Sequence, residues 1–258
     1  MGSGAGLANT SGTNNVFIGK DAGAANTTDN GNVYIGYEAG VVSTSPENVF
    51  IGAGAGHVNT TGSPNVFIGW YAGGANITGD DNVFVGKDAG ILSTASYNTF
   101  VGSKCGDATT TGGNNTFVGK EAGSANTTGA GNTLIGSGAA INATAPGNCV
   151  VVGNGAAPAL TTGTGNVIIG DTAGTVLTTG TDNVAIGNGT VFGAATHANC
   201  VALGAGATTT ATNQFVVDLG ALYLSTELAV TAAVAKASTH QIQIDIGGAT
   251  YYVLISNV

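Results

Sequence analysis

Two carboxylates that stand 17 residues apart are the first candidates for chemistry in this sequence. Asp21 and Glu38 occupy the same position in successive copies of a repeated phrase, "GKDAG" and "GYEAG". If each copy forms one turn of a stack, the two side chains lie about 5 Å apart, near the spacing of the acid pair in retaining glycosidases. Lys20 stands beside them and the next copy has Gly54 in their place. We therefore interpret the pair as a solvated, Lys-paired surface ladder and predict no catalytic residues and no enzyme.

Metal and cofactor sites are not predicted either. Cys105, Cys149 and Cys200 are too few and too scattered for a disulfide framework or a zinc site, so we interpret them as small apolar fillers. The three histidines lack the paired spacing of a metal site, and the Gly-rich nonapeptide of calcium-binding solenoids is missing.

Two polar patterns match known functional motifs, for glycosylation and for ice binding, but the sequence favours neither function. The five Asn-X-Thr triplets match the glycosylation acceptor, but we interpret them as turn residues, because the chain shows no secretion signal. They begin at Asn26, Asn59, Asn76, Asn126 and Asn142. Threonine pairs such as Thr60-Thr61 and Thr127-Thr128 suggest an ice-binding face, but adjacent strand residues point to opposite sides, which would spoil half the array.

Composition excludes several classes of partner. The net charge is −9, with five lysines and no arginine, so there is no basic stripe to neutralise phosphates, and we predict no nucleic-acid binding. No run approaches the roughly 18 apolar residues of a membrane span, and "MGSGAGLANTSG" lacks the charged and apolar regions of a signal peptide. We expect no membrane insertion.

A repeat of 16 or 17 residues governs the whole sequence. Each copy contains an "N-x-V-x-I-G"-like segment, whose closing glycine marks it at Gly19, Gly36, Gly52, Gly69, Gly86, Gly102, Gly119, Gly136, Gly153, Gly170, Gly187 and Gly204. So constant a period indicates one structural unit per copy, stacked on its neighbours. The alternation before each glycine predicts a short strand, and segments such as "AANTT" predict a second one. We expect an all-β, parallel β-solenoid of about 17 residues per coil.

The central residue of the marked strand is aromatic in seven successive copies and then shrinks to alanine. We expect the flanking pair, such as Val16 and Ile18, to face the interior of the coil and the central ring to face outward. An exposed aromatic ladder of this length predicts a subunit interface, with three chains around a shared axis; an exposed track for sugars is the alternative. The predicted interface residues are Phe17, Tyr34, Phe50, Phe67, Phe84, Phe100 and Phe117.

An asparagine opens most of the strands. We expect these side chains to form a ladder in which each amide makes a hydrogen bond to the next coil. The alternative hypothesis is that they contact a substrate. The asparagines are Asn15, Asn32, Asn48, Asn65, Asn82, Asn98, Asn115, Asn132, Asn166 and Asn183.

The two ends of the chain differ from the middle. Residues 1–212 are predicted to form about twelve coils, of which the first lacks its strand, so we expect a virion protein or a neighbouring subunit to complete that edge. Residues 213–258 are predicted to form a cap, a trimerisation element or a tip. Within them, residues 227–238 suggest a short helix or a linker, and "HQIQIDIGGATYYVLISNV" predicts a hairpin that turns at Gly247-Gly248.

Short motifs connect the repeat with two families. "DNVAIGNGT" (residues 182–190) and "NCVALGAGA" (199–207) resemble the head repeats of trimeric autotransporter adhesins, which implies a left-handed β-roll in a trimer. "NNVFIGKDAGAANTTDNGN" (14–32) more closely resembles repeats of bacteriophage tail-fibre and virion-fibre proteins, and the C-terminal 22 residues are similar to the ends of such fibres. The coil here is longer than the adhesin repeat, and we expect neither the signal peptide nor the membrane anchor of an autotransporter, which favours the resemblance to phage fibres.

We therefore expect a non-enzymatic, trimeric fibre of a phage virion, assembled in the host cytoplasm, that contributes to host attachment through a cell-surface glycan or protein. The main alternative is a bacterial surface adhesin or a head-to-tail extracellular filament subunit. An ice-binding solenoid and a polysaccharide-degrading tailspike are weaker alternatives.

Overall fold

The computed structural model describes residues 2–218, 240–246 and 249–255. They contain strands and turns and no helix. The strands are β1 (Val16–Ile18), β2 (Val33–Ile35), β3 (Val49–Ile51), β4 (Asn65–Ile68), β5 (Asn82–Val85), β6 (Thr99–Val101), β7 (Thr116–Val118), β8 (Thr133–Ile135), β9 (Val150–Val152), β10 (Val167–Ile169), β11 (Val184–Ile186), β12 (Val191–Phe192), β13 (Val201–Leu203), β14 (Thr208–Thr209), β15 (Phe215–Val217), β16 (His240–Ile246) and β17 (Ala249–Ile255).

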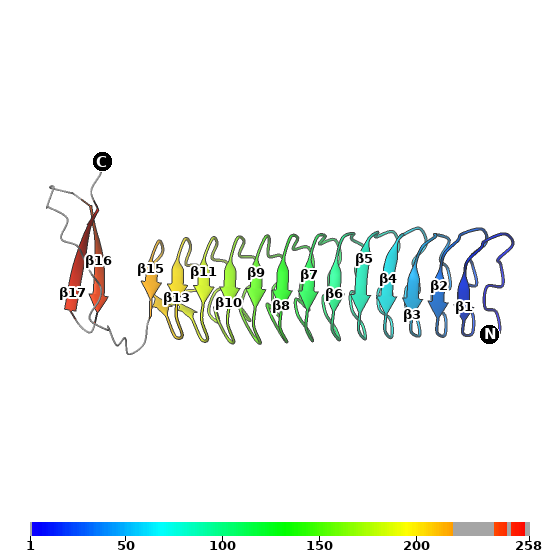
Figure 1. Cartoon of the computed structure of the whole chain (residues 1–258), viewed down its shortest axis with the longest axis horizontal. Helices are drawn as coiled ribbons and strands as arrows, with labels where there is room; N and C mark the ends of the chain where they lie inside the picture. Colours follow the sequence, from blue (N-terminus) through cyan, green and yellow to red (C-terminus); the bar gives the residue numbers. More distant parts are fainter. Residues whose placement is uncertain (1, 219–239, 247–248, 256–258) are drawn as a thin grey trace. The chain divides into compact units, whose positions relative to one another are not determined.

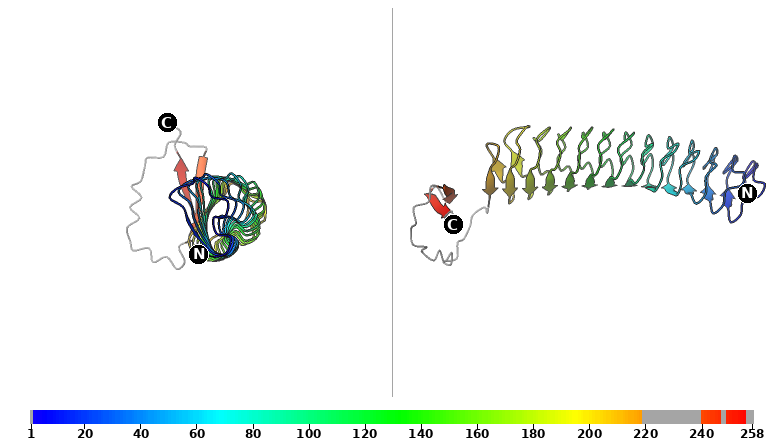
Figure 2. Two further views of the ribbon diagram at one scale, coloured as in Figure 1. Left: turned by 90° about the vertical axis from the view of Figure 1, so that its right-hand side faces the viewer. Right: turned by 90° about the horizontal axis from the view of Figure 1, so that it is seen from above.

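A parallel sheet of 13 strands organises the solenoid and confirms the predicted architecture of about twelve stacked coils (Figure 1). Equivalent residues pair across it, as Val16 with Val33 and Ile18 with Ile35 in the first two strands. We number the coils from coil 1, marked by Gly19, to coil 12, marked by Gly204. Seen along the solenoid the coils shift progressively from the N-terminal end onward, and from above the strands line one side and the turns the other (Figure 2).

The sheet ends with β15, which pairs with β13 in parallel and in register, Val201 with Phe215. The solenoid therefore continues beyond the predicted boundary at residue 213. At the C-terminal end, β16 and β17 form a separate antiparallel pair with His240 opposite Ile255, as the hairpin pattern predicts. The predicted turn at residues 247–248 and the predicted helix or linker at 227–238 lie outside the described residues.

The predicted second strand is wrong for most coils. In coil 5, for example, the predicted segment at residues 91–95 forms a turn and irregular backbone, and it follows two left-handed residues, Asp88 (φ 57°) and Gly90 (φ 54°). In coils 11 and 12 the second of these bend positions holds Val191 and Thr208, which avoid the left-handed region, and the short strands β12 and β14 pair there.

The interior of the solenoid holds the aromatic ladder, so the predicted orientation of the strands is wrong. Tyr34 and the five phenylalanines of coils 3 to 7 are completely buried within a single chain, and Phe17 is half-buried at the open end of the stack. Successive rings from Tyr34 to Phe117 lie parallel, with centroids 4.8–4.9 Å apart. The flanking pair faces outward instead, with Val16 and Ile18 42% and 49% exposed.

Small residues opposite the strand explain why the rings point inward. In coils 1 to 7 the turn brings a glycine over the ring, preceded by an alanine in every coil but coil 6, where Cys105 takes its place. A Cβ added at Gly73, for example, would lie 2.5 Å from the Phe67 ring. Residues this small leave an interior that only a large side chain fills to ordinary packing density. Both faces of the strand are apolar, so the alternation of its residues does not show which face points into the interior. The small residues opposite the strand do show it.

The predicted asparagine ladder is confirmed. The side-chain oxygen of Asn65 accepts a hydrogen bond from the backbone N–H of Asn82 (3.0 Å), and its amide donates to the carbonyl of Gly79 in the following turn (2.8 Å). Asn65 and Asn82 are 1% exposed. Because these side chains form hydrogen bonds with backbone N–H and C=O groups that the turns leave unpaired, the ladder links each coil to the next.

Candidate interaction surfaces

The seven residues predicted as a subunit interface offer no surface to a second chain in coils 2 to 7. Their rings are enclosed by their own coil and stacked on the rings of the neighbouring coils. The prediction that they form an interface is therefore corrected together with their orientation. An interface has to be sought on what the coils turn outward.

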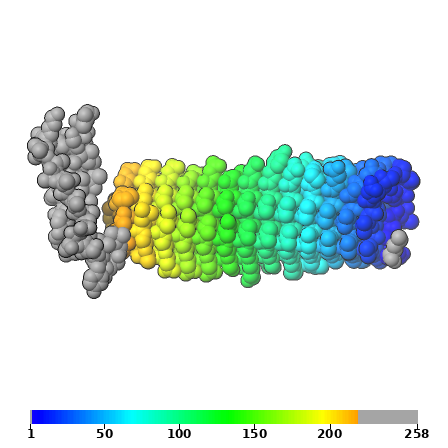
Figure 3. Space-filling model, viewed as in Figure 1, coloured from blue at the N-terminus to red at the C-terminus, as the bar shows by residue number. Residues whose placement is uncertain are grey.

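The outward face of the long sheet is apolar except for three threonines in coils 6 to 8. We call this surface the sheet face: the residues before and after the central residue of each strand. In coils 1 to 5 these are Val and Ile alone, and threonine enters only at Thr99, Thr116 and Thr133. No side chain on the sheet face carries a charge, and every one is half-buried or exposed. In the space-filling view the coils appear as closely spaced parallel ridges (Figure 3).

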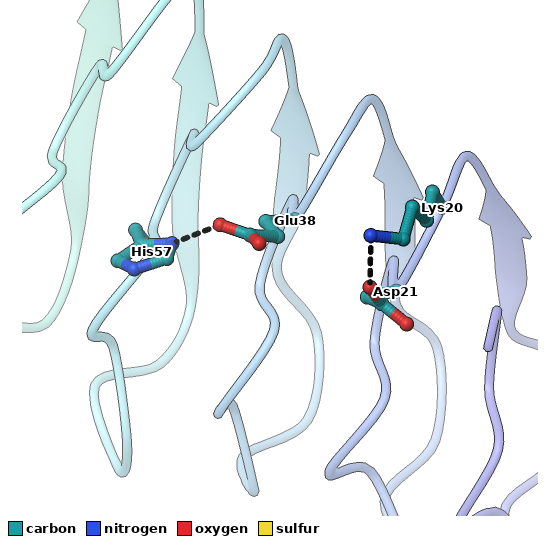
Figure 4. Close-up of polar contacts among 4 residues, drawn as sticks. All are labelled: Lys20, Asp21, Glu38 and His57. Atoms are coloured by element: carbon teal, nitrogen blue, oxygen red, sulfur yellow. Dashed lines mark ion pairs between the residues drawn. The ribbon is translucent and has the colours of Figure 1, made fainter. Parts of the chain in front are cut away.

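The two carboxylates of coils 1 and 2 are engaged by different partners. Asp21 lies 3.6 Å from the Nζ of Lys20, and Glu38 lies 3.6 Å from the Nδ1 of His57 in coil 3. Figure 4 shows Asp21 directed to Lys20 and Glu38 directed away from Asp21, toward His57. The predicted ladder with a paired lysine is thus present at Asp21, and the arrangement does not resemble two carboxylates that converge on one bond.

Large exposed aromatic residues gather at one corner of the coils. We call the two residues after each marker glycine the corner pair. In coils 2 and 4 the first of these residues, Tyr37 and Trp70, is 49% and 50% exposed. The Nζ of Lys20 lies 5.4 Å from the centroid of the Tyr37 ring, and the Nζ of Lys87 lies 5.0 Å from that of Trp70. The hydrogen bond of Tyr37 with the Glu38 carboxylate, and repulsion from that charge, raise the pKa of Tyr37.

Sequence reasoning missed these two aromatic residues. They stand at a position where most other coils have lysine, serine, asparagine or alanine, such as Ser137 and Asn154. Comparison of each coil with its neighbours would have found them, because an apolar ring at an exposed, otherwise polar position departs from the repeat.

The three cysteines and His197 lie inside the solenoid. All three cysteines are buried, and burial raises the pKa of the Cys105 thiol to about 12. The Nδ1 of His197 lies 3.0 Å from the hydroxyl oxygen of Thr209. Among residues 2–218 and the two C-terminal strands, no group of three His, Cys, Asp or Glu side chains is placed to hold a metal ion.

The polar triplets lie in turns, as predicted, whereas the threonine pairs do not follow the expected alternation. Asn26, Asn59, Asn76 and Asn126 lie in the turn half of their coils, but their side chains are completely buried and cannot be reached for glycosylation. Both members of the Thr127-Thr128 pair lie at the surface, so the argument that adjacent threonines point to opposite sides is wrong. The Thr127 hydroxyl donates to the carbonyl of Thr144 in the next coil (2.9 Å), one of a series of such bonds between coils.

Two further findings bear on function. Within the described ranges, no helix is long and apolar enough to cross a membrane. Comparison of the chain with protein-family models, curated proteins and solved structures yields no match, so its function has to be argued from these surfaces.

Proposed function

We propose that the chain is a structural fibre protein of a phage virion, a tail or head fibre, in which three copies of a left-handed β-roll pack side by side. The fibre holds its C-terminal segment away from its mounting and contributes to host attachment. The observation that carries the proposal is the sheet face, a long apolar surface that no described part of the solenoid covers.

Parallel sheets are almost always covered on both faces, and their strands then read as continuous apolar runs. The strands here read that way, as "VFI" in β1 and β3 and "VII" in β10. The interior of the coil covers one face only. A second layer is therefore expected over the sheet face.

Further copies of the same chain are the best candidates for that layer. The sheet face has no charge with which to select a partner of opposite charge, whereas identical rows of Val and Ile side chains interdigitate readily. Twelve strand spacings of about 4.8 Å and a width of about 10 Å give about 600 Å² of apolar surface per chain. A stable interface buries about 800 Å² per partner, so the columns beside the sheet face contribute as well.

The proposed location in a virion and the proposed trimeric state depend on the resemblance of the repeats to those of phage fibres. A solenoid supports that role because its coils satisfy one another's backbone hydrogen bonds along the whole sheet, as between Val16 and Asn32 or Val167 and Asn183. In the same proposal the β16–β17 hairpin belongs to a C-terminal segment that closes the stack, trimerises the chain or forms the tip of the fibre.

The mass of the particle tests the assembly. Sedimentation is expected to give three times the 24.8 kDa of the chain. The double substitution Ile68→Lys and Val85→Lys places two charges on the sheet face of β4 and β5 without entering the interior, so the trimer is expected to dissociate into folded single chains. Thr94→Lys, on an exposed turn of coil 5, is the matched control and should leave the mass unchanged. A stable wild-type monomer would refute the assembly.

The genes adjacent to the gene for this chain test its proposed location in a virion. Tail or capsid genes beside the gene for this chain are the expected result. Secretion or cell-wall genes in their place would instead support a surface adhesin built on the same trimer.

A further inference from the structure

Three threonines interrupt the sheet face in the middle of the solenoid. The residue before the central one is valine in coils 1–5 and again in coils 9–12, from Val16 to Val201. In coils 6, 7 and 8 it is threonine. These threonines pair in register across β6, β7 and β8, midway along the sheet (Figure 1). We call the cluster of Thr99, Thr116 and Thr133 the threonine belt.

The hydroxyl groups of the threonine belt are free to bond outside the chain. They make no hydrogen bond with any other residue that the structure describes. Threonines on the turns of coils 5 and 6 do, because the hydroxyls of Thr94 and Thr110 donate to carbonyls of the next coil at 3.1 and 3.0 Å. Thr116 is exposed, and Thr99 and Thr133 are half-buried. Since the neighbouring coils fold with valine, which has the same shape, the fold itself does not need these hydroxyls.

A repeating apolar face packs against a copy of itself equally well at many displacements. Successive strands are about 4.8 Å apart, so sliding one chain along another by a whole number of coils returns the Val and Ile side chains to equivalent positions. A slip of one coil loses only the contacts at the ends. Apolar packing alone therefore leaves the register of two such faces weakly specified, where register means the displacement of one chain along the other.

We propose that the threonine belt fixes this register, by aligning with the belts of further copies of the chain in a parallel, unstaggered trimer. The inference deepens the proposed fibre and rests on its assembly through the sheet face. In an unstaggered trimer the same coil of each chain lies at the same height. Each hydroxyl is both donor and acceptor, so the belts can bond to one another directly or through a shared water molecule.

A staggered contact has a penalty that grows with the displacement. A slip of one coil leaves one threonine of each facing belt opposite valine, and a slip of three coils leaves the whole belt so. A buried hydroxyl without a partner opposes association, because it has lost its hydrogen bonds to water. Staggered contacts that repeat from chain to chain produce an open filament, whereas unstaggered ones close into a ring. The threonine belt therefore favours the closed trimer.

Mixing chains whose belts lie at different heights tests the register. A shifted-belt variant moves the threonines to coils 2–4 and keeps the composition of the face. Its substitutions are Thr99→Val, Thr116→Val, Thr133→Val, Val33→Thr, Val49→Thr and Val66→Thr. It is co-expressed with affinity-tagged wild type, and mass spectrometry measures the untagged chain in the purified trimers. We expect mixed trimers to be depleted about tenfold relative to co-expressed tagged and untagged wild type.

Two further variants make the test specific. A beltless variant carries only the three changes from threonine to valine in coils 6–8. It should also mix poorly with wild type, and by itself it should form staggered assemblies larger than a trimer. The matched control makes three such changes on exposed turn residues and should mix like wild type. Its substitutions are Thr111→Val, Thr128→Val and Thr162→Val.

Sedimentation of each variant alone separates failure of the belt from failure of the fibre. If the shifted-belt chain and wild type each form trimers and mix in the statistical proportion, the belt does not set the register and the proposed assembly stands. A beltless chain that stays monomeric beside a trimeric wild type would also overturn the proposal, because the belt would then drive association itself. A monomeric wild type refutes the assembly. If the shifted-belt chain forms no trimer alone, the mixing of the beltless variant decides in the same way.

Discussion

Coils 1–7 and coils 8–12 of the solenoid follow one backbone path but fill it in different ways. In coil 4 a large central ring, Phe67, lies opposite a small polar residue, Asn76. In coil 9 the central residue is only Val151, and the opposite position holds Leu160; both are completely buried. In coil 9 the turn thus supplies part of the apolar volume that the strand supplies in coil 4.

The backbone adjusts to the same exchange. Over every aromatic ring the second bend position is glycine, as at Gly73, whereas Ala140 and Ala157 take it over Leu134 and Val151 at φ 48°. An alanine over a ring would collide with it, while over a smaller residue its methyl group fills space. The identity of the bend residue is thus coupled to the size of the side chain below it.

We call coils 1–7 the aromatic half and coils 8–12 the aliphatic half. The largest effect is expected when a buried ring is removed from the aromatic half. Phe67→Ala removes a buried ring that stacks at 4.9 Å on both neighbours, so we expect it to lower the free energy of unfolding by about 3–5 kcal/mol. Val151→Ala, the equivalent change in the aliphatic half, should cost about 1.5–3 kcal/mol. Urea unfolding at one protein concentration measures both, and equal losses would contradict the difference between the halves.

A bend glycine tests the coupling. Gly73→Ala forces a methyl group to 2.5 Å from the Phe67 ring at φ 57°, so overpacking and the left-handed backbone together should cost about 2–4 kcal/mol. The double variant Phe67→Leu, Gly73→Ala reproduces the pair that coil 8 already has, Leu134 with Ala140. The alanine should then cost much less, and a double-mutant cycle detects this. Strict additivity of the two changes would refute the coupling.

These relations show how far the sequence alone could lead. The constant period and the short alternating runs suffice to predict a parallel solenoid, and the recurring Asn predicts the ladder, because both are repeated many times. Which strand face is internal could not be read from "VFI", since Val, Phe and Ile are all apolar. The exposed rings of Tyr37 and Trp70 are single departures from the repeat, which a search for recurring residues passes over.

The aromatic half also contains a group that responds to pH. The buried Tyr34 hydroxyl donates to Ser43 Oγ at 2.8 Å, and burial raises the pKa of Tyr34 from 10.0 to about 12. Because the pKa of Tyr34 is higher in the folded state than in the unfolded state, the contribution of its neutral hydroxyl to the free energy of unfolding is intact below pH 10. This contribution is lost as the pH rises from 10 toward 12. At pH 11 the free energy of unfolding is lower by about 1.4 kcal/mol.

Tyr34→Phe should remove that loss, because phenylalanine is what the next five coils carry at this position. The measurement compares the unfolding free energies of the wild type and the variant at pH 8 and at pH 11. Burial also raises the pKa of Cys105, but this thiol is common to both proteins and cancels in the comparison. An identical fall of stability in the two proteins would show that Tyr34 does not ionise on unfolding.

The smallest effect concerns the aliphatic half, where cysteine interrupts the asparagine ladder. The Cys149 thiol donates to the carbonyl of Gly163 at 3.3 Å, in the place where Asn132 donates to Pro146, and Asn166 reaches only its sulfur, at 4.0 Å. Cys149→Asn restores a strong donor and an oxygen acceptor, so we expect a gain of about 1 kcal/mol. Urea unfolding under reducing conditions measures it.

Cys105→Asn is the matched control for this change. Cys105 occupies the position that is alanine in most coils, completely buried in the apolar interior. The same substitution should there destabilise the protein by about 1–3 kcal/mol, because the ladder offers this amide no partners. Opposite signs at the two cysteines would establish that position within the coil decides the effect of the amide. A loss at both would mean that the thiol of Cys149 fits the interior better than the asparagine of its neighbours.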